Sequence, residues 1–236
     1  MSSSEDPTFD ERFIGFVDEV ATLLAGVLPH PPPMNGEILA SRASITVGSG
    51  VPGRKGSLTE LKINGVAVAY MQAQIGCRVD SSGRYLAVTQ SSFALYSSRD
   101  KTPLFRLEFE DEMRTKPACH WQVHAERGAL AHLLTLGGAS RPHELSALHL
   151  PVGGARGRPC LEDFLQFVVE ECGIDHKSDY RQAIDAGRRL WRERQIAAFV
   201  RDTPHIGARV LSELGYSVGE PAGGHPAPKD RTLTHW

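Results

Sequence analysis

The sequence is poor in the features that mark secreted, zinc-binding and strongly charged proteins. Only four of its 236 residues are cysteines, and no Cys-x-x-Cys pair or close Cys–His spacing occurs. Disulfide frameworks and zinc fingers need such spacings, so we expect four free thiols in a reducing compartment. The 26 Lys and Arg residues against 28 Asp and Glu residues leave a net charge of −2, so no global charge attracts nucleic acid or an anionic membrane.

Long hydrophobic runs and a secretory leader are also missing. Charges or glycines interrupt every apolar stretch before the roughly 18 residues that a transmembrane helix needs. The polar residues 2–6 contain neither the basic region nor the apolar region of a signal peptide. The sequence therefore predicts a cytoplasmic protein that does not enter the membrane.

The remaining composition is that of a globular domain. Hydrophobic residues make up 41%, charged residues 23% and aromatic residues 7%, close to the averages of soluble domains. At roughly 150 residues per domain, the length predicts one domain with appendages. We assign residues 1–216 to that domain and residues 217–236, which are rich in Gly, Pro and charge, to a flexible tail.

Helical periodicity occurs at both ends of the predicted domain. Apolar residues recur every three to four positions over residues 7–28, where Thr8 and Glu11 form a capping-box pattern. Residues 160–215 show the same period in three stretches, the last beginning at Thr203-Pro204. We expect the apolar residues of that last helix to face the core: Ile206, Val210, Leu211 and Leu214.

Between the helical regions, residues 58–152 alternate with a period of two. This pattern predicts antiparallel strands at 58–63, 66–79, 85–89, 93–97, 104–110, 119–125 and 145–152, with a short helix at 129–136. Residues 34–57 are interpreted as a long loop holding one edge strand. The order of elements predicts an α+β fold, in which helices cover one face of an antiparallel sheet and the other face is open.

Two neighbouring strands concentrate residues of catalytic types. In strand 104–110, Arg106 and Glu108 fall on the polar side, and in strand 119–125, His120, Gln122 and His124 do the same. If the strands pair through the short connection 111–118, these five side chains share one face of the sheet within a few ångströms.

A third strand and the loop after it extend this prediction. His149 points away from the apolar side of strand 145–152, and the glycine-rich turn that follows carries Arg156 and Arg158. Such a turn before a helix can present backbone N–H groups and arginines to a phosphate. It lacks the Gly-Lys-Ser/Thr of a nucleotide-binding P-loop, so ATP or GTP binding does not follow. The alternative interpretation is an ordinary strand-to-helix turn.

Together these residues suggest a phosphodiester site. His124 and His149 would act as general base and acid, Arg106 with an arginine of the 156–158 loop would stabilise the developing charge, and Glu108 would orient a histidine. RNA supplies its own nucleophile, the 2′-hydroxyl, so the hypothesis needs no metal or other cofactor.

Two alternatives remain at this point. A metal site would need His120, His124 and His149 to converge with Glu108 or Glu126, but residues four apart in a strand lie about 13 Å apart. In the second alternative, the histidines are ordinary solvated residues of an open sheet face.

The predicted helix at 177–201 is locally basic. Its arginines, Arg188 and Arg192 among them, are candidates for contact with an RNA backbone or an acidic partner. The alternative is a solvated face whose arginine stems cover apolar surface.

The segment Pro103-Leu104-Phe105-Arg106-Leu107-Glu108, followed by the strands of His120 to His124 and of His149, resembles the TumE-like toxins of bacterial toxin–antitoxin systems. Those toxins place an Arg-x-Asp strand before a histidine-rich strand. This chain has Glu108 in place of the Asp and His-x-x-x-His in place of a tighter pair. The resemblance implies ribonuclease activity and a cognate antitoxin as partner. The composition, rich in Arg, Ala and Gly, is similar to that of proteins from high-GC, actinobacteria-like genomes.

The sequence therefore predicts a cytoplasmic, RNA-directed, nuclease-like protein of a toxin–antitoxin or phage-defence system. The alternative is a non-catalytic module that binds another protein or a second copy of itself.

Overall fold

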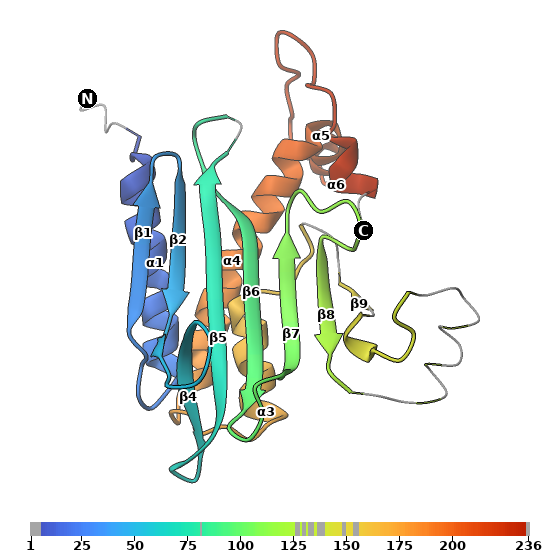
Figure 1. Ribbon diagram of the computed structural model, residues 1–236. Helices are drawn as coiled ribbons and strands as arrows, with labels where there is room; N and C mark the ends of the chain where they lie inside the picture. Colours follow the sequence, from blue (N-terminus) through green and yellow to red (C-terminus); the bar gives the residue numbers. More distant parts are fainter. Residues whose placement is uncertain are drawn as a thin grey trace.

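The computed structural model describes residues 6–80, 82–125, 128, 131, 135, 140–147, 150–152 and 156–234. An N-terminal helix is followed by an antiparallel sheet and then by further helices (Figure 1), so the predicted α+β fold is confirmed. The strands are β1 (Met34–Leu39), β2 (Arg42–Val47), β3 (Ser49–Gly50), β4 (Ser57–Ile63), β5 (Val66–Val79), β6 (Leu86–Ser97), β7 (Pro103–Glu110), β8 (Cys119–Val123) and β9 (Leu150–Pro151). The helices are α1 (Phe9–Val27), the 3₁₀ turn η1 (Leu145–Ala147), α3 (Leu161–Glu170), α4 (Tyr180–Asp202), α5 (Pro204–Glu213) and α6 (Asp230–Thr234).

The strands form one antiparallel sheet in the order β1-β2-β5-β6-β7-β8-β9. The long strand β5 has two partners on one edge, because β2 pairs with its second half and β4 with its first half. The turn between β4 and β5 uses Asn64 and Gly65, both at positive φ, and the Asp175 carboxylate accepts hydrogen bonds from both backbone N–H groups. This turn was signalled by the Asn-Gly pair, which favours left-handed backbone.

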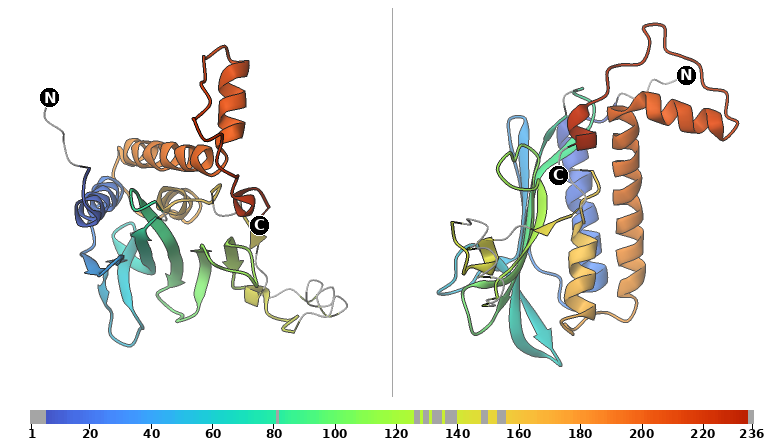
Figure 2. Two further views of the ribbon diagram at one scale, coloured as in Figure 1. Left: turned by 90° about the horizontal axis from the view of Figure 1, so that it is seen from above. Right: turned by 90° about the vertical axis from the view of Figure 1, so that its right-hand side faces the viewer.

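The helices form two layers on one face of the sheet. Helices α1 and α3 pack against β6, and α4 lies across α1 and α3 on their far side (Figure 2). The core therefore lies between the sheet and the first helical layer. We call the opposite face of the sheet the outer face. None of the helices α1, α3, α4, α5 and α6 covers it (Figure 2).

Helix α1 begins and packs as its sequence predicts. Thr8 accepts a hydrogen bond from the Glu11 backbone, and the Glu11 carboxylate accepts one from the Thr8 N–H in return. The apolar stripe that faces the core is buried: Phe13, Val20, Leu23, Leu24 and Val27. Three of the four cysteines, Cys77, Cys119 and Cys160, are buried free thiols, as expected.

Several strand predictions were wrong. Residues 34–57 form the β1–β2 hairpin and β3 instead of a loop with one edge strand, and the hairpin turns at Ala40, whose φ of 54° carries no glycine signal. The strands predicted at 85–89 and 93–97 are the single strand β6. The strand predicted at 145–152 is the turn η1 followed by the short β9. The helix predicted at 129–136 lies largely outside the described residues.

The C-terminal part differs in how it packs. Helix α5 begins at Pro204 as predicted, but Val210, Leu211 and Leu214 are exposed, so the prediction that its apolar residues face inward was wrong. Within the predicted tail, α6 is held to the end of α4, where buried Asp202 accepts hydrogen bonds from the Thr232 hydroxyl and the Lys229 ammonium group. Among the described residues, no helix combines the length and the apolar character needed to cross a membrane.

Candidate functional site on the outer face of the sheet

The β7–β8 pair brings the predicted polar residues together. The strands are antiparallel neighbours, with Arg106 opposite Gln122 and Glu108 opposite His120. The sequence predicted both the pairing and the shared face, because strands joined by a short connection form a hairpin and side chains alternate with a period of two. We call Arg106, Glu108, His120, Gln122 and His124 the polar cluster.

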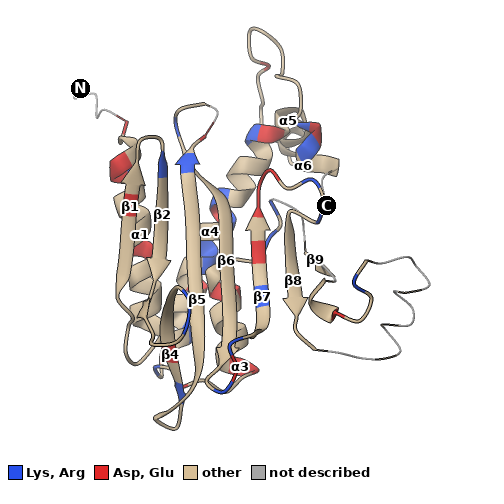
Figure 3. Ribbon diagram, in the orientation of Figure 1, with Lys and Arg blue, Asp and Glu red and all other residues tan. Residues whose placement is uncertain are grey.

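The alternation is visible in the charges of the strands. Strand β7 carries an arginine followed by two glutamates at alternate positions, whereas β8 beside it contains no Lys, Arg, Asp or Glu (Figure 3). The intervening residues of β7 face the helices, where Leu107 and Phe109 are buried. The cluster therefore sits directly over the core without exposing it.

Glu108 is the electrostatic centre of the cluster. Its carboxylate lies 3.3 Å from Arg106 Nη1, 3.5 Å from Lys116 Nζ and 3.4 Å from His120 Nε2. The hydrogen bond from His120, together with the positive charges of Arg106 and Lys116, lowers the pKa of Glu108 to about 2, against the raising effect of burial. Glu108 is thus ionised at neutral pH, and it is too weak a base to accept a substrate proton.

Arg106 is fixed on two sides. One guanidinium nitrogen pairs with Glu108, and another donates a hydrogen bond to the Gln122 side-chain oxygen. Gln122 is buried, whereas about a third of the Arg106 side chain is exposed. The guanidinium therefore has a defined orientation and still reaches the surface of the outer face.

His120 is the most buried member of the cluster. Only 1% of the residue is exposed, and its ring nitrogens contact the Pro117 carbonyl oxygen, at 3.0 Å from Nδ1, and the Glu108 carboxylate. The turn η1 contacts β8 beside it. Both ring nitrogens thus lie against protein oxygens in the interior, so His120 orients Glu108 and does not itself reach a ligand.

His124 is the cluster residue best placed to exchange a proton. It follows the end of β8, where its backbone N–H donates to the Leu104 carbonyl at 3.0 Å and so holds it beside β7. Its Nε2 atom is buried and has no hydrogen-bond partner within the described part of the chain. Burial lowers the pKa of His124 below its usual value, and the charge of Arg106 acts in the same direction while Glu108 opposes it. The imidazole is therefore neutral at pH 7.

Sequence reasoning missed Lys116, Tyr96 and Arg54. Lys116 lies in the connection between β7 and β8, and its proximity to Glu108 follows only from the path of that connection. Tyr96 lies close enough to Arg106 and Glu108 for both charges to act on its pKa, which burial raises. Arg54, from the loop before β4, stacks over the Tyr70 ring at 4.5 Å. No sequence motif marked these three residues, although Lys116 lies within the predicted connection 111–118.

Arg156 and Arg158 do not join the polar cluster, contrary to prediction. The Arg158 guanidinium lies on the helical side of the sheet, between the rings of Phe109 (3.9 Å) and Trp191 (4.6 Å). Arg156 donates to the buried carboxylate of Asp202 at 2.8 and 2.9 Å. These contacts hold both arginines on the helical side, so neither guanidinium is placed to clamp a phosphate at the cluster.

Arg188 and Arg192 are engaged within the helical layers. Arg188 donates to Asp163 at 2.8 Å and to Gln166, which ties α4 to α3. Arg192 lies 4.0 Å from the same Asp163 carboxylate and is largely exposed. Arg188 therefore serves packing, and only Arg192 of this predicted pair presents its charge at the surface.

The predicted acid His149 and the candidate ligand Glu126 lie outside the described residues. In the described part of the chain, no group of three or more His, Cys, Asp or Glu side chains is arranged to hold a metal ion. Comparisons with protein-family models, with curated proteins and with solved structures found no match for the chain. The resemblance to TumE-like toxins therefore stays a prediction, and the polar cluster is the feature of the described residues that bears on function.

Proposed function

We propose that the chain is a cytoplasmic, RNA-directed nuclease in which His124 is the general base and Arg106 stabilises the charge of the transition state. The supporting observation is the neighbourhood of these two side chains. A neutral imidazole, whose buried Nε2 has no hydrogen-bond partner among the described residues, lies beside a guanidinium whose orientation Glu108 and Gln122 fix. A base and a fixed cation on one surface are what cleavage of RNA through its 2′-hydroxyl requires.

The proposed step begins at the 2′-hydroxyl of the substrate. His124 takes its proton, the 2′-oxygen attacks the adjacent phosphorus, and Arg106 neutralises the negative charge that develops on the phosphoryl oxygens. The 5′-oxygen leaves as a hydroxyl, and the sequence offers His149 as the source of its proton. His120 is a positioning residue, because it holds Glu108, which in turn holds Arg106.

Local charge supports RNA as the substrate class despite the net charge of −2. At the cluster, the cations of Arg106 and Lys116 both lie within 3.5 Å of the Glu108 carboxylate. Protein–RNA affinity depends on local cationic groups that contact phosphates, so the sign of the whole chain is not decisive.

The test compares cleavage of one labelled RNA by the wild type, His124→Ala and His143→Ala. His143 is a matched control, because its side chain is 72% exposed and its ring contacts Glu144. We expect His124→Ala to lose about 100-fold or more of the rate, His143→Ala to keep it, and a chelator to leave it unchanged.

A second substrate decides the chemistry. The same RNA with a single 2′-deoxy nucleotide at the cleaved position should resist the wild-type protein at that bond. Cleavage of both substrates at equal rates, or full activity in His124→Ala, would contradict the proposal. Unfolding by urea should show that His124→Ala stays within about 1 kcal/mol of the wild type, which excludes loss of the fold as the cause.

The resemblance to TumE-like toxins supplies the proposed setting, a toxin–antitoxin or phage-defence system. In that setting, induced expression of the wild type should arrest bacterial growth, whereas His124→Ala should not. Co-expression of a cognate antitoxin should restore growth. Equal growth with both proteins would leave the nuclease without this biological role.

A second candidate function, self-assembly or binding of another protein, is favoured by α5. This helix projects from the layered body (Figure 2) and exposes Val210, Leu211 and Leu214. Light scattering after size exclusion should then give a mass above that of one chain, reduced to one chain by Leu211→Ser with Leu214→Ser. A monomeric wild type that captures no partner would remove this candidate.

A further inference from the structure

We infer that the outer face binds one nucleobase of the RNA on a surface formed by Tyr96, Leu104 and Gln72, and that this surface favours a base with a keto oxygen over adenine. We call these three residues the base subsite. The inference rests on the proposed nuclease function, because that function places a phosphate on Arg106, and the base has to be joined to this phosphate.

Strand pairing places the base subsite next to Arg106. Ala94 of β6 lies opposite Arg106 of β7 and opposite Gln72 of β5, so these three residues share a row across the outer face. The Tyr96 hydroxyl reaches the Gln72 side chain, and the charges of Arg106 and Glu108 act on the pKa of Tyr96. Two strand spacings, about 10 Å, separate Gln72 from Arg106. One nucleotide spans this interval from its phosphate to the edge of its base.

Leu104 and Tyr96 supply an apolar surface on which a base can lie. On β7, the side chain that follows Leu104 is that of Phe105, which packs inward against Phe167. Leu104 therefore points outward, and 38% of it is exposed. Tyr96, on the neighbouring strand, is partly exposed as well. Unpaired bases of single-stranded RNA stack on exposed aromatic rings of this kind, whatever the base.

Gln72 gives the subsite its selectivity. Its Oε1 atom accepts a hydrogen bond from the Tyr96 hydroxyl at 3.2 Å. Its amide nitrogen bonds no acceptor in the described part of the chain and is not a buried atom, so it reaches the surface as a donor. A keto oxygen of uracil accepts from this donor. Adenine has no keto oxygen and presents an amino group, whose partner on Gln72 already holds Tyr96.

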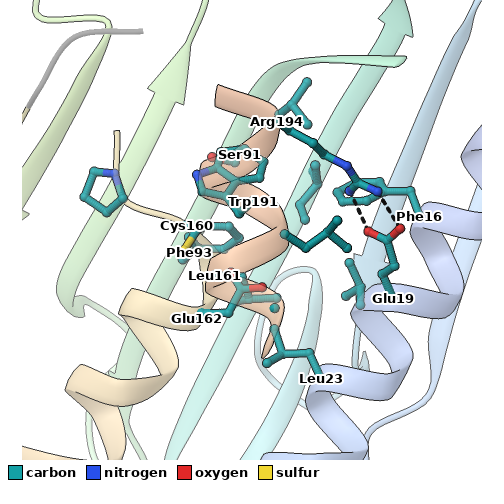
Figure 4. A pocket seen from close by; sticks show the side chains of 16 residues that line it. Phe16, Glu19, Leu23, Ser91, Phe93, Cys160, Leu161, Glu162, Trp191 and Arg194 are labelled. Atoms are coloured by element: carbon teal, nitrogen blue, oxygen red, sulfur yellow. Dashed lines mark hydrogen bonds and ion pairs between the residues drawn. The ribbon is translucent and has the colours of Figure 1, made fainter. Parts of the chain in front are cut away.

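Two hollows elsewhere in the described chain suit a nucleotide less well. The cavity between the sheet and the helices measures about 60 Å³, well below the roughly 150 Å³ that holds benzene, and the ion pair of Glu19 and Arg194 joins α1 to α4 beside it (Figure 4). The larger hollow, of about 440 Å³, includes the Glu110 end of β7. Its lining contains the carboxylates of Glu37, Glu110, Asp111 and Glu112 against the guanidinium groups of Arg42 and Arg78. This excess of negative charge repels a phosphate chain, which favours a path from Arg106 toward Tyr96.

The order of the strands indicates which nucleotide the subsite holds. Strand β7 lies between β6 and β8, so Tyr96 and His124 lie on opposite sides of Arg106. In the proposed step, His124 takes the proton of the 2′-hydroxyl, which places the nucleotide on the 5′ side of the cleaved bond near β8. The base subsite therefore holds the nucleotide on the 3′ side, whose 5′-oxygen leaves.

The experiment uses DNA strands that contain one ribonucleotide, so that a single bond can be cleaved through a 2′-hydroxyl. The nucleotide on the 3′ side of that bond carries uracil, adenine or no base. With the full-length wild type, we expect kcat/KM to fall about tenfold from uracil to the abasic strand, through the loss of one stacked base. From uracil to adenine it should fall about fivefold, through the loss of one hydrogen bond.

Variants of the subsite separate stacking from hydrogen bonding. Tyr96→Leu should remove most of the difference between uracil and the abasic strand, whereas Tyr96→Phe, which keeps the ring, should retain it. Gln72→Met keeps an unbranched side chain without the amide, so it should equalise uracil and adenine and preserve the abasic effect. Tyr85→Leu is the matched control. Tyr85 is an exposed tyrosine beside the other end of β6, with Arg201 over its ring, and its replacement should change neither ratio.

A binding measurement distinguishes failure of this inference from failure of the nuclease proposal. A short abasic DNA backbone that carries one uracil, one adenine or no base is titrated with the wild type and followed by fluorescence anisotropy, which requires no cleavage. Equal Kd values for uracil and for no base would overturn the inference, as would equal losses of selectivity in Tyr96→Leu and Tyr85→Leu. Selective binding of uracil without cleavage of any strand would refute the nuclease and leave the base subsite in place.

Discussion

The two faces of the β7–β8 pair are held by different forces. On the outer face, the Glu108 carboxylate lies within 3.5 Å of the charges of Arg106 and Lys116 and of the His120 ring. On the inner face, rings from the strands pack against rings of α3, edge-on or stacked, with centroid distances of 5.3 to 5.9 Å. Charge is sensitive to pH and salt, whereas packing is sensitive to volume. Residues one position apart on the same strand should therefore respond to entirely different perturbations.

The sharpest test of this contrast is Arg158, a cation on the inner face. It is buried between Phe109 and Trp191, and burial lowers its pKa to about 10, so it remains charged at neutral pH. Arg158→Ala removes the side chain that fills this space. We expect the free energy of unfolding to fall by about 3 kcal/mol, measured by urea denaturation, from the cavity and the lost stacking.

The matched control for Arg158→Ala is Arg158→Met. Methionine keeps an unbranched apolar stem but neither the full length nor the charge of arginine, so it should recover part of the loss. Both variants, while folded, should cleave RNA at the wild-type rate. If Arg158→Met lost as much free energy of unfolding as Arg158→Ala, the charge and not the packing would matter here. That result would contradict the contrast between the two faces.

Glu108→Gln is expected to have the next largest effect, on the outer face. It leaves Arg106 and Lys116 without their shared carboxylate, and we expect a loss of about 2 kcal/mol at pH 7. Because the pKa of Glu108 falls from 4.5 to about 2 on folding, its contribution is complete above pH 4.5 and is lost as pH falls toward 2. As the pH falls through that range, the free energy of unfolding of Glu108→Gln should therefore decrease less than that of the wild type.

The control for Glu108→Gln is Glu110→Gln, two residues along the same strand. Glu110 is exposed, so its replacement should change the free energy of unfolding by no more than about 0.5 kcal/mol. Urea titrations from about pH 2.5 to pH 7 compare the three proteins. Parallel pH curves for the wild type and Glu108→Gln would show that the outer face is not held by this charge.

The sequence revealed the outer cluster more completely than the inner face, for a physical reason. Alternation with period two and a short connection determine which side chains share a face, so the members of the cluster followed from local rules. The side of the sheet on which Arg158 lies depends on the path of a loop and on the packing of α4, which no local pattern contains. Lys116 was missed for the same reason.

Helix α5 and the β1–β2 hairpin show two other limits of the sequence. An amphipathic pattern reveals that α5 has an apolar side, but it does not say whether this chain covers that side. The hairpin turns at Ala40 with positive φ, so the usual Gly or Asn signal was absent. Strand pairing with β5 overrides that weak turn, and it is visible only in three dimensions.

A smaller effect is expected from a glycine in the helical layers. A Cβ at Gly26 of α1 would lie 2.5 Å from Ala183 Cβ of α4, so Gly26→Ala should push the helices apart and cost about 1 to 2 kcal/mol. Gly15 is the control on the same helix, because its Cβ would meet nothing within 4 Å. Gly15→Ala should stabilise the protein by up to about 1 kcal/mol through helix propensity. Thermal unfolding that ranks the two variants in the reverse order would contradict close packing between α1 and α4.

The smallest expected effect on stability is that of His124→Gln, and its value lies in the pH dependence. Burial and the charge of Arg106 lower the pKa of His124 in the folded state, so the unfolded chain binds more protons as pH falls through 6.5. The contribution of His124 to the free energy of unfolding is therefore fully present above pH 6.5 and is lost as the pH falls below it. Glutamine does not titrate, so the difference in free energy of unfolding between about pH 7 and pH 5 should be smaller in the variant than in the wild type. A wild type whose stability rises over the same interval on acidification would mean that His124 is protonated in the folded state, which would remove its role as a general base and leave the outer face organised by charge alone.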